Sequence, residues 1–429
     1  MNSRDPSQLA VALYRREQLP WLLSGCTLGL VEGATAAVLI KRGFADTVPR
    51  EGLNLAVAFV SGAPALANVT SFLWANLAHG RERVGLLVFL LVLFGCSVGA
   101  LGFLPHASQG LALAVLAVLA ARIIWSGILT VRAAVWSANY PRAILARITG
   151  RIVILTSVGM ASTAGLAGFV LEASPAQAPH LYVAAGIAGV AAAWLARRVR
   201  VRQSFRLRRA ELLAAGSTEV FSLRLMREVL ANDPEYRRFM TCMALYGAGN
   251  LMIWGQLVIV FTDQLRLSPA MQVSILTLVP LLCVPLFTPL WARMFDAGHV
   301  IEFRARQCWA AVAGMTLMII AVYTRHQPLL WCAALLFGVS TAGASLGWNL
   351  GHNDFASLGK VQQYMGVNVT LTGIRGLLAP PAGAIVYTLL ERRSPGTGRM
   401  ALLLPLGISI AGAIGFNRMK HRRTGSARA

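Results

Sequence analysis

Long apolar runs alternate with short polar stretches along almost the whole chain. A helix needs about 17–25 mostly apolar residues to cross the ~30 Å hydrocarbon core of a membrane. Runs of that kind predict twelve spans, at residues 20–40, 52–77, 84–104, 110–136, 148–172, 180–196, 236–262, 269–292, 306–324, 327–348, 363–388 and 400–417. The alternating pattern of a membrane β-strand is absent from the sequence. The pattern therefore predicts an all-α membrane protein with twelve transmembrane helices.

Composition agrees with lipid as the main solvent. The chain is 56% apolar and 13% charged, whereas soluble domains carry about a quarter charged residues. The six cysteines lie in or beside apolar runs, without the spacing of metal ligands. We therefore expect buried thiols, and neither disulfides nor a metal site.

Positive charge predicts the orientation of the helices. Of the 39 Lys and Arg residues, 28 fall on the side that carries both termini, 8 on the opposite side and 3 within spans. Because cytoplasmic loops carry the excess of Lys and Arg, both termini are expected in the cytoplasm. The strong preference for Arg over Lys is typical of a GC-rich bacterial genome, which indicates the bacterial cytoplasmic membrane.

The longest polar segment divides the spans into two sets of six. This basic linker covers residues 197–235 and separates residues 1–196 from residues 236–429. The motif Leu-Trp-Ala ends equivalent helices at Ala75 and Ala292, an offset of 217 residues that other landmarks also keep closely. A repeat in the same orientation predicts two pseudo-symmetric six-helix bundles, related by an axis along the membrane normal.

This organisation resembles the major facilitator superfamily. The family signature between helices 2 and 3 is degenerate here, since Leu77 and Ala78 are kept and His79 replaces the usual acid, while the second copy has an acid at Asp296. The resemblance implies a transporter that rocks two halves around a central site lined by helices 1, 4, 7 and 10. The glycines of the helix 5 pattern of exporters are present without its proline, so the direction of transport stays open.

Three charged residues fall in the middle third of predicted spans, namely Glu32, Arg122 and Arg375. A charge at mid-membrane costs on the order of 2.5–3.5 kcal/mol and so needs a partner or a function. We expect Glu32 to carry a coupling proton, and both arginines to hold an anionic group of the substrate, because a guanidinium matches carboxylate or phosphate. The alternatives are a structural Glu32–Arg122 pair and an Arg375 that satisfies carbonyls of a kinked helix.

The predicted helix 236–262 carries Tyr246, Asn250 and Trp254 at a spacing of four residues, hence on one face. Glycines weaken the middle of the same helix. This face is either part of a substrate site at a broken helix, or a packing surface of small residues with Asn250 as its polar contact.

Two acidic residues are candidates for a cytoplasmic gate. Asp354 follows the predicted helix 327–348, where it would pair with Arg147 or Arg151. Asp296 is the acid of the second signature copy. The alternative for Asp354 is an ordinary solvated turn.

Residues 197–209 are strongly basic and are expected to bind anionic headgroups of the lipid bilayer. An aromatic stacking platform does not accompany the charge, so no nucleic acid is expected as a partner.

The sequence lacks a phosphate-binding loop and the common hydrolase motifs, so we expect neither enzymatic activity nor a cofactor. The hypothesis is a monomeric secondary active transporter of a small-molecule solute, working by alternating access. It is driven by a gradient, with proton coupling and an anionic or zwitterionic substrate favoured. A multidrug or metabolite exporter of the same fold is one alternative, and a non-transporting membrane scaffold or sensor is another.

Overall fold

The computed structural model describes residues 8–105, 107–140, 142–201, 205, 209, 223–356 and 360–426. All regular elements within these residues are helices. Eleven of the described helices are long and apolar enough to cross a membrane, and a bent pair raises the number to twelve if it counts as one span. The predicted all-α membrane fold is therefore confirmed. Six of the thirteen residues in the predicted basic segment 197–209 lie outside the described residues.

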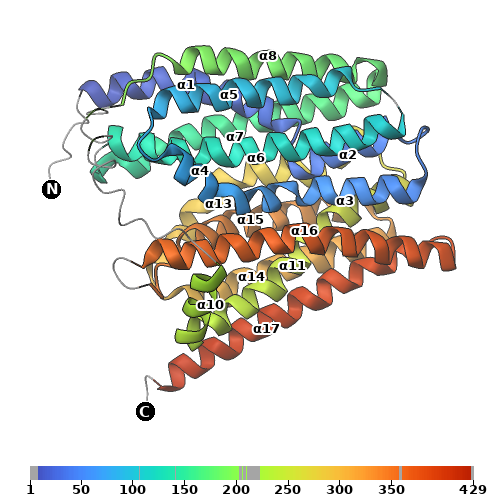
Figure 1. Ribbon diagram of the computed structural model, residues 1–429. Coiled ribbons are helices and arrows are strands. Elements are labelled where there is room, and N and C mark those ends of the chain that lie inside the picture. The colour runs from blue at the N-terminus through green and yellow to red at the C-terminus, as the bar shows by residue number, and fades with distance from the viewer. Residues whose placement is uncertain are drawn as a thin grey trace. The chain divides into compact units, whose positions relative to one another are not determined.

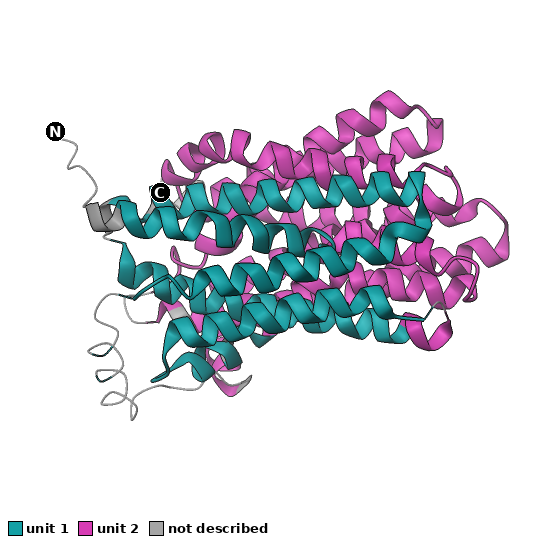
Figure 2. Cartoon of the chain, turned by 90° about the horizontal axis from the view of Figure 1, so that it is seen from above, with its two compact units in different colours: residues 1–32, 70–105, 112–220 teal, residues 33–69, 106–111, 221–429 magenta. Residues whose placement is uncertain are grey.

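The first compact unit comprises residues 1–32, 70–105 and 112–220 (Figure 2). Within it, α1 packs against α7 and α8, and α5 packs against α8. Its helices are α1 (Gln8–Gly29), α4 (Ser71–Ala78), α5 (Arg83–Ala100), α6 (Ser108–Asn139, whose first turn belongs to the other unit), α7 (Arg142–Ala173) and α8 (Ala178–Ala196).

The second compact unit comprises residues 33–69, 106–111 and 221–429. Within it, α11 packs against α16 and α17, and α14 packs against α15 and α17. Its helices are α2 (Gly33–Gly43), α3 (Arg50–Ala67), α10 (Leu223–Asn232), α11 (Pro234–Asp263), α12 (Pro269–Val273), α13 (Val279–Asp296), α14 (Val300–Thr324), α15 (Gln327–Leu350), α16 (Val361–Arg393) and α17 (Leu403–Ser426).

Contacts within the second unit join helices that are far apart in the sequence. Helices α2 and α3 come early in the chain, yet α3 packs against α16 (Figure 1). Helices α2 and α3 also both pack against α11. The compact units thus divide the chain inside its first membrane span, at residues 32 and 33. The division into two repeated six-helix bundles, with boundaries at residues 196 and 236, stays a prediction.

The first membrane span is broken, which corrects the expectation of one helix over residues 20–40. Helices α1 and α2 are bent by 43° across the short break between Gly29 and Gly33. A Cβ at Gly29 would collide with the backbone of Met160 on α7. Close packing against α7 therefore demands a glycine where the helix ends, because only glycine lets the two backbones approach so closely. By contrast α11, where glycines suggested weakness, runs unbroken.

Helix α14 begins at Val300, six residues earlier than the predicted span at 306. Its first turn is capped because His299 Nδ1 accepts from the Ile301 amide at 3.3 Å, and Asp354 Oδ2 accepts from the Val300 amide at 2.7 Å. These acceptors satisfy amides that an uncapped helix start leaves unpaired. Because the helix starts earlier, it includes Arg304, which was expected in a loop.

Candidate functional site

Glu32 and Arg122 form an ion pair where the first membrane span bends. Glu32 is the last residue of the break before α2, and Arg122 lies near the middle of α6. Arg122 Nη1 donates to Glu32 Oε2 at 2.5 Å. The Arg122 side chain is 10% exposed and that of Glu32 is 27% exposed, so the carboxylate is the more accessible partner. The pair brings together two of the three predicted mid-membrane charges.

Arg122 keeps one donor unused. Within the described residues its Nε is buried and has no hydrogen-bond partner. Buried N–H groups in folded proteins nearly always have a partner, so a lone one calls for an explanation. The geometry therefore leaves a donor at Arg122 for a group beyond Glu32.

Arg375 on α16 has its guanidinium occupied by protein oxygens. Its Nη1 donates to the Met243 carbonyl of α11, its Nη2 to Thr372 Oγ1 at 2.5 Å, and its Nε to the Leu371 carbonyl at 3.2 Å. Gly247 leaves the necessary space, because a Cβ there would collide with Nη1. Arg375 thus donates to a carbonyl of its own helix, as in the alternative considered, and through the Met243 carbonyl it also ties α16 to α11. Its binding of substrate stays a prediction.

Tyr246, Asn250 and Trp254 share one face of the unbroken α11, but they have different surroundings. Tyr246 is buried, and its hydroxyl accepts from Gln307 Nε2 at 3.2 Å. Trp254 packs on Phe337 of α15, with ring centroids 4.9 Å apart. Asn250 is half-buried. Tyr246 is thus committed to a protein network, whereas Asn250 and Trp254 keep exposed surface.

A buried arginine that the sequence prediction missed belongs to the same network. Arg304 on α14 is 1% exposed, and its Nη1 donates to Gln307 Oε1 at 2.8 Å. Gln307 in turn donates to the Ser340 carbonyl on α15 at 3.1 Å. The sequence repeat could have predicted this helix start. An offset of 217 residues from Arg83, where α5 begins, gives Val300, where α14 begins. A helix starting there includes position 304.

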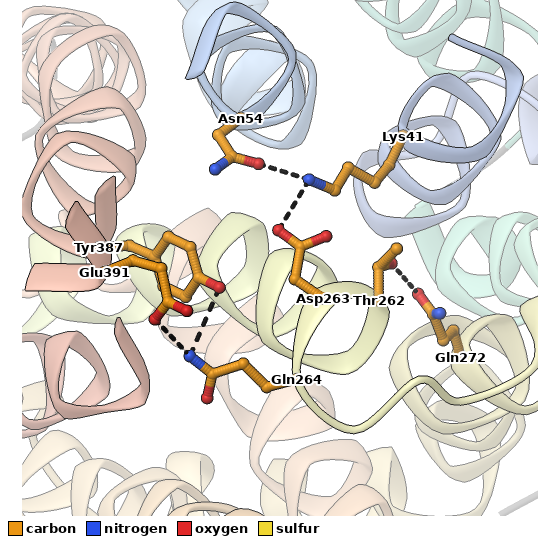
Figure 3. Close-up of polar contacts among 8 residues, drawn as sticks. All are labelled: Lys41, Asn54, Thr262, Asp263, Gln264, Gln272, Tyr387 and Glu391. Atoms are coloured by element: carbon orange, nitrogen blue, oxygen red, sulfur yellow. Dashed lines mark hydrogen bonds and ion pairs between the residues drawn. The ribbon is translucent and has the colours of Figure 1, made fainter. Parts of the chain in front are cut away.

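A second buried ion pair, also missed, joins α2, α3 and α11 (Figure 3). Lys41 Nζ donates to Asp263 Oδ2 at 3.0 Å and to Asn54 Oδ1 at 2.5 Å. The side chains of Lys41 and Asp263 are 3% and 18% exposed. The count of Lys and Arg residues on each side of the membrane treated Lys41 as a loop residue. In the structure it lies in the last turn of α2. Only the fold shows that this ammonium faces an aspartate.

Further polar contacts join α2 and the end of α11 to neighbouring segments. Thr35 Oγ1 donates to Thr277 Oγ1 at 3.0 Å, and Arg42 Nη2 donates to the Leu267 carbonyl at 2.7 Å. Next to Asp263, Gln264 Nε2 donates to Glu391 Oε2 at 2.9 Å (Figure 3). The ends of α2 and α11 therefore meet through a polar network.

Glu17 lies before the predicted first span and is nevertheless 1% exposed. It accepts from Trp136 Nε1 at 2.5 Å, from the Tyr140 hydroxyl at 2.9 Å and from Trp21 Nε1 at 3.1 Å. The guanidinium of Arg132 stacks over the rings of Trp21 and Trp136, at 4.7 and 4.3 Å from their centroids. This cluster ties α1 to the end of α6. Arg132 is half-buried over these two rings.

The two gate candidates lie at helix ends. Asp354 caps α14 through the Val300 amide, and Asp296 is the exposed last residue of α13. Burial and the nearby Arg423 lower the pKa of His299, the capping neighbour of Asp354. The structure thus gives Asp354 a capping contact, and a gate role for either acid stays a prediction.

Across the described part of the chain, no group of three or more His, Cys, Asp or Glu side chains is arranged to hold a metal ion. The chemistry within reach of these clusters is the binding of protons and of charged or polar solutes.

Comparison with known proteins identifies the architecture. The family model described as Major Facilitator Superfamily matches residues 21–380. By sequence, no curated protein matches the chain.

Solved structures of transporters share the fold over nearly the whole chain. A D-xylose–proton symporter superposes with a TM-score of 0.72 at 12% identity, covering 95% of this chain and 97% of its own. The nucleoside transporter NupG gives a TM-score of 0.71 at 11% identity, covering 95% and 98%. A bacterial homologue of the human lysosomal transporter Spinster gives 0.66 at 12% identity, covering 98% of each chain. At such low identities the similarity establishes the fold alone.

Proposed function

The chain belongs to the major facilitator superfamily, and we propose that it moves a small solute across the membrane by alternating access. The observation that carries this proposal is the Glu32–Arg122 ion pair at the break in the first span. Charges within a membrane span are expensive and mark solute or proton pathways. Broken helices near the midplane are also where transporters build their sites.

In this proposal Glu32 carries the coupling proton. Its side chain is the more exposed member of the pair. Protonation of Glu32 removes the charge that holds Arg122 and frees the guanidinium for an anionic or zwitterionic solute. The Nε of Arg122, which has no partner within the described residues, supplies a further donor. The planar N–H donors of a guanidinium match a carboxylate or phosphate.

Other predicted site residues take secondary roles in the proposal. Asn250 and Trp254 have exposed surface for contact with solute. Tyr246 and Arg375 hold their helices in position, because their polar atoms already bond to protein groups. Asp354 supports the cytoplasmic end of α14 as its cap.

The Lys41–Asp263 pair supports the alternating-access part of the proposal. Lys41 and Asn54 belong to the first half of the sequence repeat and Asp263 belongs to the second half. Halves that rock about a central site must break such contacts in the opposite conformation. We infer that this pair holds the extracytoplasmic ends of α2, α3 and α11 together in the present one.

The proposed setting follows from charge. Both termini lie in the cytoplasm of a bacterial cell, and the basic residues 197–209 bind anionic headgroups. The proposal also takes the protein to be a monomer. Its partners are then the solute and the bilayer.

Transport by reconstituted protein tests the proposal. A thermal-shift screen against metabolites first identifies the solute, because a ligand of the folded state stabilises it by mass action. In proteoliposomes with an imposed proton gradient, Glu32→Gln is expected to abolish accumulation and keep solute exchange. Arg122→Ala should weaken solute affinity about tenfold, the equivalent of ~1.4 kcal/mol.

Glu51→Gln is the matched control, since it removes an exposed carboxylate that pairs with Arg392. Accumulation that ignores pH in the unaltered protein would contradict proton coupling. Full affinity in Arg122→Ala would contradict an anion-binding role. Absence of any solute movement, with folded protein in the liposomes, would favour a scaffold or sensor.

A further inference from the structure

A cavity of about 470 Å³ lies at the end of α11, among residues near the ends of α14 and α16. Its charged and polar lining includes Arg266, Arg325, Arg399, Gln264, Asp263 and Glu391. All belong to the second compact unit. Three arginine residues therefore line one cavity.

The two acids in this cavity already have partners within the protein. Asp263 pairs with Lys41. Glu391 accepts from the amides of Gly396 at 2.9 Å and Gly398 at 2.8 Å, as well as from Gln264. These contacts use the carboxylates within the protein.

The three arginines have no such partner. Across the described residues, Arg266, Arg325 and Arg399 form no ion pair, and the one ring contact is that of Arg399 with Tyr323, 4.8 Å from the ring centroid. Arg266 and Arg325 are exposed and Arg399 is half-buried. The cavity thus has three available cations beside two satisfied acids.

The backbone at two of these arginines is unusual. Arg266 has φ 53° and Arg325 has φ 54°, and they are the two non-glycine residues with positive φ in the described chain. Left-handed backbone strains a residue that has a Cβ, so helix ends usually carry Gly or Asn there. A positive charge near a helix C-terminus is favourable, but an arginine in the last turn supplies it without strain. The helix dipole alone therefore does not explain arginine at both positions.

Their predicted side of the membrane makes these arginines rarer still. The sequence assigns 8 basic residues to the extracytoplasmic side, and 3 of them line this cavity. Loops on that side are normally poor in Lys and Arg. Strained backbone often persists where a ligand is held, and here the strain coincides with unpaired charge and an accessible cavity.

We propose that this cavity is a binding site for a small, soluble multivalent anion bearing carboxylate or phosphate groups. Guanidinium groups match such anions through paired N–H donors. The aliphatic lining is limited to Leu265 and Val322, so the cavity has no tract for an acyl chain. The site goes beyond the proposed transport function. It lies on the predicted extracytoplasmic side alone, and an anion can bind there without being transported.

Thermal unfolding of the purified full chain in neutral detergent tests the site. Citrate, inorganic phosphate and chloride are compared at equal ionic strength. Citrate and phosphate are expected to raise the unfolding midpoint, whereas chloride is not. Arg266→Gly and Arg325→Gly should each weaken citrate binding about tenfold. Because glycine adopts positive φ freely, neither variant should lower the midpoint without ligand.

Arg393→Ala is the control, since it removes an exposed charge from the same end of α16 outside the cavity. It should bind citrate as the unaltered chain does. Undiminished stabilisation by citrate in the double variant Arg266→Gly/Arg325→Gly would overturn the proposal. So would a lack of stabilisation by citrate and phosphate, or stabilisation by phosphatidylglycerol vesicles alone, which would assign the charge to lipid.

Discussion

Lys41 Nζ lies 3.0 Å from Oδ2 of Asp263, although 222 residues separate them in the sequence. Asn54 supplies a second oxygen to the same ammonium at 2.5 Å. A buried ammonium needs such partners, because desolvation costs several kcal/mol for each ion. The pair therefore makes the end of α2 depend on the end of α11.

Loss of one partner should cost more than loss of both. Asp263→Asn leaves a buried ammonium without its counter-ion and should lower the free energy of unfolding by about 3–5 kcal/mol. Lys41→Met leaves a partly exposed carboxylate and should cost less. The double variant Lys41→Met/Asp263→Asn should lose less than the sum. A double-mutant cycle by unfolding in detergent measures this coupling.

An exposed ion pair provides the matched comparison for that cycle. Arg423 and Glu235 lie 3.3 Å apart with side chains 41% and 52% exposed. Arg423→Ala should change the free energy of unfolding by about 0–1 kcal/mol. Additive effects of the Lys41 and Asp263 substitutions would show that the two side chains act independently.

Gly247→Ala should destabilise the protein through Arg375. A methyl group at position 247 collides with Nη1 of Arg375, which donates to the Met243 carbonyl. Overpacking of this kind typically costs about 1–3 kcal/mol. Thermal unfolding of the variant beside Gly407→Ala measures it.

Gly407 is the matched control because no atom lies within 4 Å of its added Cβ. Alanine there should be neutral, or stabilise α17 by up to about 1 kcal/mol through helix propensity. Equal midpoints for the two variants would mean that Arg375 moves aside at little cost.

Glu17→Leu should leave three donors without their acceptor. The indoles of Trp21 and Trp136 and the hydroxyl of Tyr140 all donate to this carboxylate. Each unsatisfied buried donor costs about 1–3 kcal/mol, so we expect a loss of roughly 3 kcal/mol or more. Glu17→Gln keeps one acceptor oxygen and should lose less. If Glu17→Leu were as stable as the unaltered chain, the hydrogen bonds of this cluster would not contribute to stability.

His299 should make stability depend on pH. Burial, followed by the charge of Arg423, lowers its pKa below the ordinary 6.5, against the opposing effects of Asp354 and Glu235. Neutral Nδ1 also accepts from the Ile301 amide. Because the folded-state pKa is depressed, this stability is complete above about pH 6.5 and is lost as pH falls through the folded value.

His299→Asn separates capping from titration. Asn is a good N-cap and does not titrate. Unfolding midpoints at a series of pH values from 8 to 5 should therefore fall less for this variant than for the unaltered chain. Parallel pH profiles would exclude His299 as the titrating group.

Local pattern was enough to predict most of the membrane-spanning helices of this protein. Lipid offers no hydrogen bonds, so each backbone group inside the membrane must be satisfied within its own helix. The apolar runs that mark α5, α8 and α15 therefore appear directly in the sequence. The break between α1 and α2 was missed, because the demand for Gly29 comes from Met160, a residue far away in the chain.

Some of the charged sites could likewise be predicted from the sequence, and others could not. Glu32 and Arg122 were predictable as candidates because a charge in an apolar run stands out, and their closeness agreed with one of the alternatives considered. Lys41 and Arg304 stood at the margins of apolar runs, where a charge is ordinary. Only packing showed that both are buried.

The sequence by itself determined that this chain is a helical membrane protein with a repeated set of spans, because hydrophobic length and charge bias act locally along the chain. Tertiary structure alone decided which side chains meet: Lys41 with Asp263, Arg375 with the Met243 carbonyl, and three arginines around one cavity. Such pairings depend on helix rotation and on close contacts between distant segments. No short stretch of sequence contains that information.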